Sequence, residues 1–307
     1  MADPDLVLSG LRGSHPLGAL ATFGLLRVLS RVALPQPVKL SWVEHADWVP
    51  RLTFPHPVAR QTLICALVRD VAQRGQAPEL TWRDDLKAPL PDYHAFAQGM
   101  LPTLTPEQRQ TADFLAAFGS ELVAMHSRPE TRPTALDMTS GQQRFLRAVR
   151  TLVHGMAAEP AQAEQAVAEA LWGPWRYRDP VHALGWDPHR ERLHAYAAQK
   201  PIQSQVRSVK AAVWLGFEAL PLFPTAAVAH RLQTGGFNAQ HDDFSWPIWE
   251  VPLTLAVVRS VLSLAELVAE RPSAPLLKAR GIIQVYRSRR SRSDRGYGLL
   301  RPSTRVV

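Results

Sequence analysis

The chain has 307 residues, enough for one large domain or two modest ones, and its 46% hydrophobic content is that of an ordinary globular core rather than a disordered protein. Its single cysteine, Cys65, excludes an internal disulfide and any zinc site built from several cysteines. The positive charge is local, because residues 271–307 hold ten Lys or Arg against one acid, Asp294, for a net charge of +9, whereas the whole chain carries +8.

The first 171 residues are mainly helical in their apolar spacing, with prolines interrupting the pattern. Apolar periodicity and turn residues predict the following elements in chain order: a helix over 17–32, a strand over 38–43, a loop over 50–57, a helix over 58–74, a strand over 79–82, a proline-rich connection over 87–102, a helix from Thr105 to about His126, and helices over 140–154 and 160–171.

From Trp172 onward the chain is richer in aromatic residues, Pro and Asp. The same criteria predict a strand over 192–197, a helix over 206–220, an irregular stretch over 221–249, a helix from about 252 to 270, a strand over 281–288 and a weaker strand over 297–300.

These elements predict a helix-dominated α+β fold, with short strands forming one or two small antiparallel sheets. We expect a mainly helical region over 1–170 and an aromatic, Pro-rich α+β region with a basic end over 171–307, or a single compact domain made of both.

No sequence motif of an enzyme is present: the chain lacks a nucleophile elbow, a phosphate-binding loop and a paired-carboxylate signature. The residues closest to a metal-ligand pattern are His182, Asp187, His189, His194 and the pair His241-Asp242. Histidine and aspartate are also ordinary loop residues, so we assign no catalytic residue, no metal and no cofactor.

One aromatic block, Phe244-Ser245-Trp246-Pro247-Ile248-Trp249, is unusual. Aromatic residues that alternate with proline cannot all face one core, so we expect Trp246 and Trp249 to form a surface that stacks on unpaired bases or packs on a partner. Core packing is the alternative for these indoles, as for the other tryptophans.

The basic end of the chain is the strongest physical signal. A dense run of guanidinium groups suits phosphate oxygens, and neutralised phosphates release counterions. We expect the strand that begins near Gly281 to position this run, although a solvated or disordered basic tail is the alternative. The expected phosphate contacts are Arg280, Arg287, Arg289, Arg290, Arg292 and Arg295.

A family resemblance rests on six groups of residues that are spread over nearly the whole chain. They are Leu11-Arg12-Gly13 with Pro16-Leu17-Gly18-Ala19-Leu20 and Leu25-Leu26-Arg27; Thr139-Ser140-Gly141-Gln142; Leu184-Gly185-Trp186-Asp187-Pro188 with Arg190-Glu191-Arg192; Glu218-Ala219-Leu220-Pro221-Leu222-Phe223-Pro224; Thr234-Gly235-Gly236-Phe237 with the aromatic block; and 281–289.

In these stretches the chain resembles the CRISPR-associated proteins of type I-U (also called I-G) interference systems. Two relatives in these systems fit equally, the compact large-subunit-like protein and the extension family associated with the helicase-nuclease. The resemblance implies a subunit of an RNA-guided complex that binds double-stranded DNA. It supplies no catalytic residues.

Three functional hypotheses follow. The first is a non-enzymatic subunit of such an antiviral defence system, which binds target DNA, guide RNA or both and helps recruit the nuclease. Its partners would be the other interference subunits and these nucleic acids. The second is a metal-dependent hydrolase or nuclease that uses the His/Asp set, and the third is a protein–protein scaffold with a basic tail. The acidic first residues and the lack of a long uncharged run predict a cytoplasmic location without a membrane partner.

Overall fold

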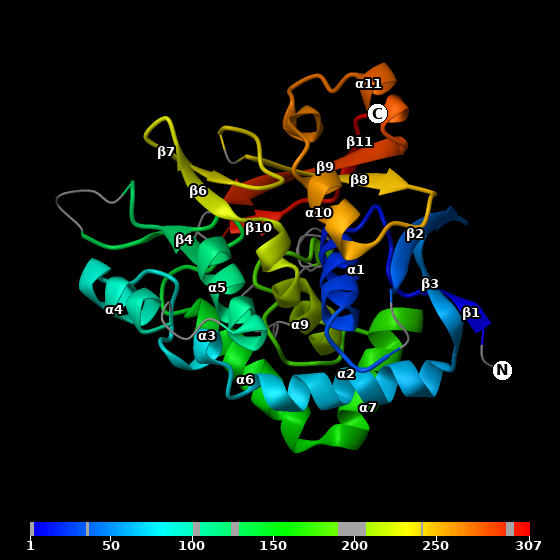
Figure 1. Ribbon diagram of the computed structural model, residues 1–307, viewed down its shortest axis with the longest axis horizontal. Helices are drawn as coiled ribbons and strands as arrows, with labels where there is room; N and C mark the ends of the chain where they lie inside the picture. Colours follow the sequence, from blue (N-terminus) through cyan, green and yellow to red (C-terminus); the bar gives the residue numbers. More distant parts are fainter. Residues whose placement is uncertain are drawn as a thin grey trace, which may run out of the picture.

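A helix that is buried along its entire length lies between the other layers of the molecule (Figure 1). The computed structural model describes residues 3–34, 37–100, 105–123, 129–189, 207–240, 242–292 and 298–307. The buried helix, α1 (Pro16–Leu29), begins with proline at its first position, where the missing N–H costs nothing. The His15 ring caps it, because Nδ1 accepts a hydrogen bond of 3.2 Å from the Gly18 amide.

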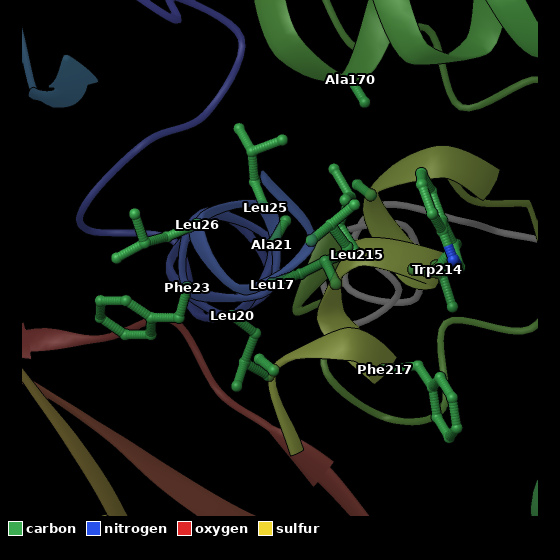
Figure 2. Packing of buried hydrophobic residues seen from close by; sticks show 14 of the residues in the cluster. Leu17, Leu20, Ala21, Phe23, Leu25, Leu26, Ala170, Trp214, Leu215 and Phe217 are labelled. Carbon is green, nitrogen blue, oxygen red and sulfur yellow. The ribbon is translucent and has the colours of Figure 1, made fainter. Parts of the chain in front are cut away.

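Helix α9 (Lys210–Glu218) packs directly against α1 (Figure 2). Gly24 permits the approach, since a Cβ at this position would lie 1.7 Å from the carbonyl oxygen of Leu215. Leu17 and Ala21 of α1 face Leu215, whereas Trp214 projects from the side of α9 away from α1. The two helices therefore form a tightly packed central pair around which the rest of the core is built.

Further helices cover the lower side of this pair in Figure 1. Amphipathic α6 has one apolar face, with Phe145, Val149, Leu152 and Met156 buried. The helices of this half are α2 (Arg60–Arg74), α3 (Pro78–Thr81), α4 (Leu90–Met100), α5 (Pro106–Phe118), α6 (Phe145–Ala158) and α7 (Pro160–Trp172).

Two larger antiparallel sheets flank the helices. The first has the order β1-β3-β2, from β1 (Asp3–Val7), β2 (Lys39–Glu44) and β3 (Trp48–Val58). In the second, β9 (Ile282–Arg292) is central and pairs with β8 (Asp243–Trp249), β10 (Gly298–Leu300) and β11 (Thr304–Arg305). Among the described residues, 42% are helical and 23% lie in strands, which confirms the expected helix-dominated α+β class.

Smaller elements complete the described part of the chain. They are the pairs β4 (Gly119–Ser120) with β5 (Arg132–Pro133) and β6 (Thr225–Val228) with β7 (Arg231–Thr234), the 3₁₀ turns η2 (Leu220–Leu222) and η3 (Ala265–Val268), and the helices α10 (Leu255–Leu262) and α11 (Ala274–Ala279).

The proline-based expectations were wrong in three places. Residues 79–82 fall largely in α3 and 87–102 contain α4, because Pro78 and Pro91 occupy first-turn positions where proline favours a helix. The expected loop over 50–57 belongs to β3. Pro50 still contributes its carbonyl, which accepts a hydrogen bond from Leu8, while Pro55 and Pro57 lie where the pairing with β1 is irregular.

Other boundaries also differ from the expectations. The irregular stretch expected over 221–249 contains β6, β7 and β8, and the helix expected to reach 270 ends at Leu262, where Ser263 and the extended Leu264 stop it. The helix expected to run to His126 ends at Phe118. The strand expected over 192–197 lies outside the described residues.

The main hydrophobic core is a single cluster in space, and its buried residues come from positions between Leu6 and Leu300, on both sides of residue 170. A smaller cluster of Leu267, Leu277, Ile282 and Val285 lies where η3 and α11 cover β9. No helix in the described ranges has both the length and the apolar character needed to cross a bilayer.

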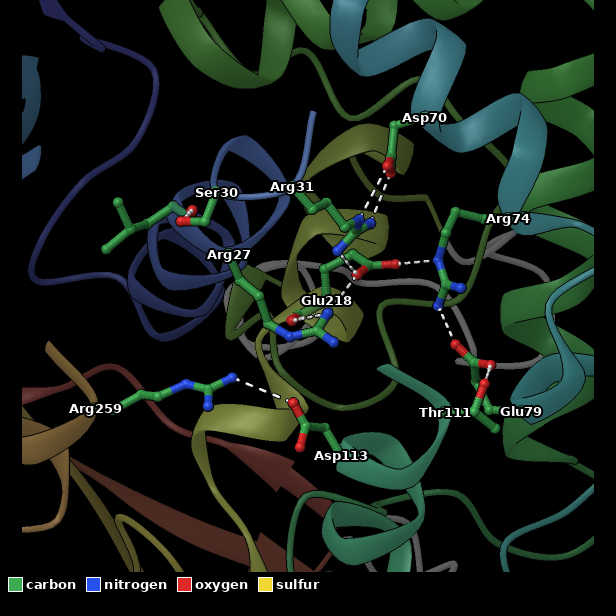
Figure 3. A network of polar contacts seen from close by, with 11 residues as sticks. Arg27, Ser30, Arg31, Asp70, Arg74, Glu79, Thr111, Asp113, Glu218 and Arg259 are labelled. Carbon is green, nitrogen blue, oxygen red and sulfur yellow. Dashed lines mark hydrogen bonds and ion pairs between the residues drawn. The ribbon is translucent and has the colours of Figure 1, made fainter. Parts of the chain in front are cut away.

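A cluster of buried charges joins α1, α2 and α9 (Figure 3). Glu218 is fully buried and accepts hydrogen bonds from Arg27 (2.8 Å), Arg31 (2.9 Å) and Arg74 (2.7 Å). Arg31 also binds Asp70 through two nitrogens, at 3.0 and 2.7 Å. Burial opposes the ionised form of Glu218, but the three guanidinium groups outweigh it and lower the pKa of this carboxyl to about 2.

The cluster extends to α3 and α5. Arg74 forms an ion pair of 2.7 Å with Glu79, which in turn accepts a hydrogen bond of 2.8 Å from the Thr111 hydroxyl. Three cations face three carboxylates, so the buried charges balance. Such a pairing sets the relative positions of four helices and one short helix, because any displacement leaves a charge uncompensated.

Candidate nucleic-acid interface

Strand β9 carries the basic residues of the carboxyl-terminal segment into an ordered sheet. Its residues alternate, so Gln284, Tyr286 and Ser288 face the main core while Val285 and Arg287 face η3 and α11. Burial raises the pKa of Tyr286, with a further contribution from Asp47, so its hydroxyl stays neutral. The sequence was right to expect a strand near Gly281, and the strand extends to Arg292.

Arg287 is used inside the protein. Its guanidinium donates hydrogen bonds to the carbonyl oxygens of Leu267 (3.3 Å), which lies in η3, and of Ala269 (2.6 Å) and Glu270 (3.3 Å), which follow it. Its Nε also donates to the Ser245 hydroxyl at 2.9 Å. This arginine therefore ties β8, β9 and η3 together and has few donors left for a phosphate.

Arg290 is also half-buried, and its Nη2 donates to the carbonyl oxygen of Asp137 at 3.3 Å. The backbone of Arg292 ends β9, but its side chain is outside the described part of the structure, as is all of Arg295.

Two of the expected contacts are exposed to solvent. Arg280 follows α11 at one end of β9, and Arg289 lies near the other end. Arg289 lies seven positions after Ile282, which corresponds to about 23 Å along the strand. Arg280 and Arg289 thus cannot share one compact site, but they can contact successive parts of an extended polyanion.

Two arginines that the sequence reasoning omitted lie beside β9. The Arg301 amide donates a hydrogen bond of 2.9 Å to the Arg289 carbonyl, and Arg305 pairs with Tyr286 in β11. Both side chains are exposed. In the sequence, only their position in the basic segment points to a role in phosphate binding. Charge density does not predict that the chain runs back along β9 and brings these two arginines beside it.

The expectation that Trp246 and Trp249 form an exposed surface was wrong. Their exposed fractions are 0% and 1%, and their indole nitrogens donate to the carbonyl oxygens of Gly13 (2.7 Å) and Leu40 (2.9 Å). The pairing of β8 with β9 shifts register between Ile248 and Trp249, and this irregularity allows both rings to pack in the core. The Trp249 ring stacks on Phe23 of α1, with 6.2 Å between centroids.

The described members of the candidate metal set do not converge. Asp187 pairs with His15, 3.3 Å from Nε2, and its Oδ1 accepts a hydrogen bond from the His189 amide. The His182 ring accepts from the Leu184 amide, and His182 and His189 line different cavities. Among the described residues no group of three or more His, Cys, Asp or Glu is placed to hold a metal ion, while His194 and His241 lie outside them.

Comparisons with known proteins give no further assignment. No family model, no curated protein and no solved structure matches the chain.

Proposed function

We propose that this protein binds nucleic acid through phosphate contacts from exposed arginines of the carboxyl-terminal sheet. The observation that carries the proposal is the pair Arg289 and Arg301, two exposed arginines whose backbones are joined by a hydrogen bond of 2.9 Å. Arg305 and Arg280 extend the same basic region toward the other end of β9. The side chains start from an ordered sheet, so fewer degrees of freedom are lost on binding than for a disordered tail.

The chemistry of the region favours phosphate over other anions. A guanidinium group donates two parallel hydrogen bonds to a phosphate, and each neutralised phosphate releases counterions. The net charge of +9 over residues 271–307 contrasts with the near-neutral remainder of the chain, which concentrates the attraction on this side. These contacts position a nucleic acid and do not read its base sequence.

The setting that we propose for this binding is an antiviral CRISPR interference complex of type I-U/I-G in the cytoplasm. The support is the resemblance of the six groups of residues described above. In that setting the protein is a non-enzymatic subunit that contacts target DNA, guide RNA or both and helps recruit the nuclease. Its partners are then the other subunits of the complex.

Fluorescence anisotropy with labelled duplex DNA, single-stranded DNA and single-stranded RNA tests the proposal on the full chain. Truncation is a poor test, because removing β9 onward also removes the fully buried Ser288 and Leu300. The double substitution Arg289→Ala with Arg301→Ala should weaken binding, whereas Arg69→Ala, on an exposed position of α2, should not. Equal binding by all three proteins would reject the interface, and tight binding to an acidic peptide alone would favour the scaffold hypothesis.

A further inference from the structure

A cavity of about 500 Å³ adjoins the basic segment on the side of the α1 amino terminus. Its described walls come from four parts of the chain: the loop that leads into α1, the segment from the end of α7 to Tyr177, the pair Pro188 and His189, and the pair Pro302 and Ser303. The volume lies within the range of small-molecule sites, roughly 300–1,000 Å³. None of the described residues that line it is a carboxylate, and Arg12, which also lines it, is exposed.

Aromatic rings form much of the wall. Tyr177 stacks on His189 with 3.7 Å between ring centroids and 12° between planes, and Trp175 meets the His15 ring edge-on at 5.2 Å. Trp172 completes this wall. The backbone of Tyr177 has φ = 52°, a left-handed conformation that costs an aromatic residue roughly 1–2 kcal/mol. The fold thus holds the Tyr177 ring in place against a local preference.

The polar groups of the cavity are mostly engaged within the protein. Ser9 donates to the Trp172 carbonyl, Ser14 pairs with Asp47, and the Ser303 hydroxyl donates to the Ser14 carbonyl. The indole nitrogens of Trp172 and Trp175 donate to the carbonyl oxygens of Val7 and Ala170.

The His15 ring is engaged as well. Nδ1 accepts a hydrogen bond from the Gly18 amide, and Nε2 lies 3.3 Å from Oδ1 of Asp187. A ring with both nitrogens occupied is not available as a general base. The cavity therefore offers ring faces and a cation rather than a hydrogen-bond pattern or a catalytic group. Its chemistry matches a flat aromatic ligand that carries negative charge.

The cavity adjoins the chain segment that carries the proposed phosphate surface. Pro302 and Ser303 line it and directly follow Arg301, which is hydrogen-bonded to the backbone of Arg289. We propose that the cavity receives an unpaired base of a single-stranded nucleic acid, stacked on the aromatic wall, with the adjoining phosphate on Arg12. This inference rests on the proposed function, because the strand reaches the cavity along the arginine pair.

Two substitutions test the cavity. Tyr177→Gly removes the stacking ring at a backbone position that glycine adopts without strain, and Arg12→Ala removes the cation. Trp82→Leu is the matched aromatic control, since this half-buried ring stacks on Phe96 of α4 and does not line the cavity. Thermal unfolding of each variant shows which of them are folded at the temperature of the binding assay.

The readout is the affinity of each variant for single-stranded and duplex DNA of the same sequence. Tyr177→Gly should lower single-strand affinity by about 5- to 100-fold, the range for removal of one base stack, and change duplex affinity by less than about twofold. Unchanged single-strand affinity, or an equal decrease for both DNA forms, would overturn the cavity assignment while the Arg289/Arg301 result still decides the phosphate surface. A wild-type protein that binds neither form would reject the proposed function itself.

A free mononucleotide carries the same base and phosphate and so could occupy the same cavity. Competition with adenosine monophosphate separates the two sources. A single strand that binds much more tightly than the mononucleotide supports the proposal, because only the strand also contacts Arg289 and Arg301. Equal affinities would show a nucleotide site instead of a strand site.

Discussion

The amide of Arg301 donates a hydrogen bond of 2.9 Å to the carbonyl of Arg289, so two exposed arginines twelve positions apart are held next to each other. β10 and β11 both run antiparallel to β9, and this arrangement places Arg301 opposite Arg289. A sequence run of arginines is thereby converted into a surface, and only some of its members take part.

Arg287 should prove structural rather than functional. Arg287→Ala removes the donors that bind three carbonyl oxygens in and just after η3 and the Ser245 hydroxyl, so we expect a decrease of roughly 2–3 kcal/mol in the free energy of unfolding. Arg271→Ala, an exposed neighbour in the basic segment, should change it by less than about 0.5 kcal/mol. Urea denaturation measures both. An Arg287→Ala protein as stable as the wild type would contradict the assignment.

The close packing of α1 on α9 gives a steric prediction. Gly24→Ala places a Cβ 1.7 Å from the Leu215 carbonyl, and the helices must move apart, at a cost of about 3 kcal/mol. Gly155→Ala is the control, because no atom lies within 4 Å of a Cβ there and α6 should gain roughly 0.5–1 kcal/mol. Differential scanning calorimetry should show opposite shifts in Tm. Equal Tm values for Gly24→Ala and the wild type would mean that the helices do not meet as described.

The buried charge cluster predicts an acid sensitivity. The pKa of Glu218 is lowered from 4.5 to about 2, so its ionised form stabilises the native state above pH 4.5, and this contribution is lost as the pH falls from 4.5 through 2. Glu218→Gln should cost about 3–5 kcal/mol at neutral pH, because three arginines then share too little negative charge. The same variant should lose less stability than the wild type between neutral pH and pH 3.

Unfolding measured over this pH range checks the prediction, with Glu159→Gln as the control for an exposed acid. The control should follow the wild-type profile. A Glu218→Gln profile parallel to that of the wild type would show that another group dominates the acid transition.

Apolar periodicity predicted the long helices well, because α1, α2, α6 and α7 each pack an extended apolar face. It failed at α3, which was expected to be a strand, and at α4, where the prolines indicated a connection although Pro91 occupies the first turn of a helix. It also failed at β8, whose residues are almost all buried and so show no polar–apolar alternation.

The buried cluster around Glu218 was not anticipated. Its one sequence signal is that Arg27 and Arg31, and likewise Asp70 and Arg74, are four residues apart. Which arginine meets which carboxylate depends on how these segments pack in three dimensions, and their spacing in the sequence does not show this.

The candidate interface was predictable in location but not in membership. Charge density indicates the segment after residue 270, whereas the half-buried position of Arg287 against η3 depends on a contact between elements. The burial of Trp246 and Trp249 likewise follows from α1 packing on β8 rather than from the aromatic block itself. The density of arginine thus predicted phosphate binding, and the fold determined which arginine side chains are exposed.

A salt titration of nucleic-acid affinity is the decisive test of whether Arg289 and Arg301 contact phosphate groups. The wild-type protein should show a linear fall of log K with log salt concentration for duplex DNA, and the Arg289→Ala, Arg301→Ala double variant should show a slope shallower by roughly 0.9 for each phosphate that the variant no longer neutralises. Arg69→Ala should retain the wild-type slope. A double variant whose slope equals that of the wild type would show that Arg289 and Arg301 do not neutralise phosphates.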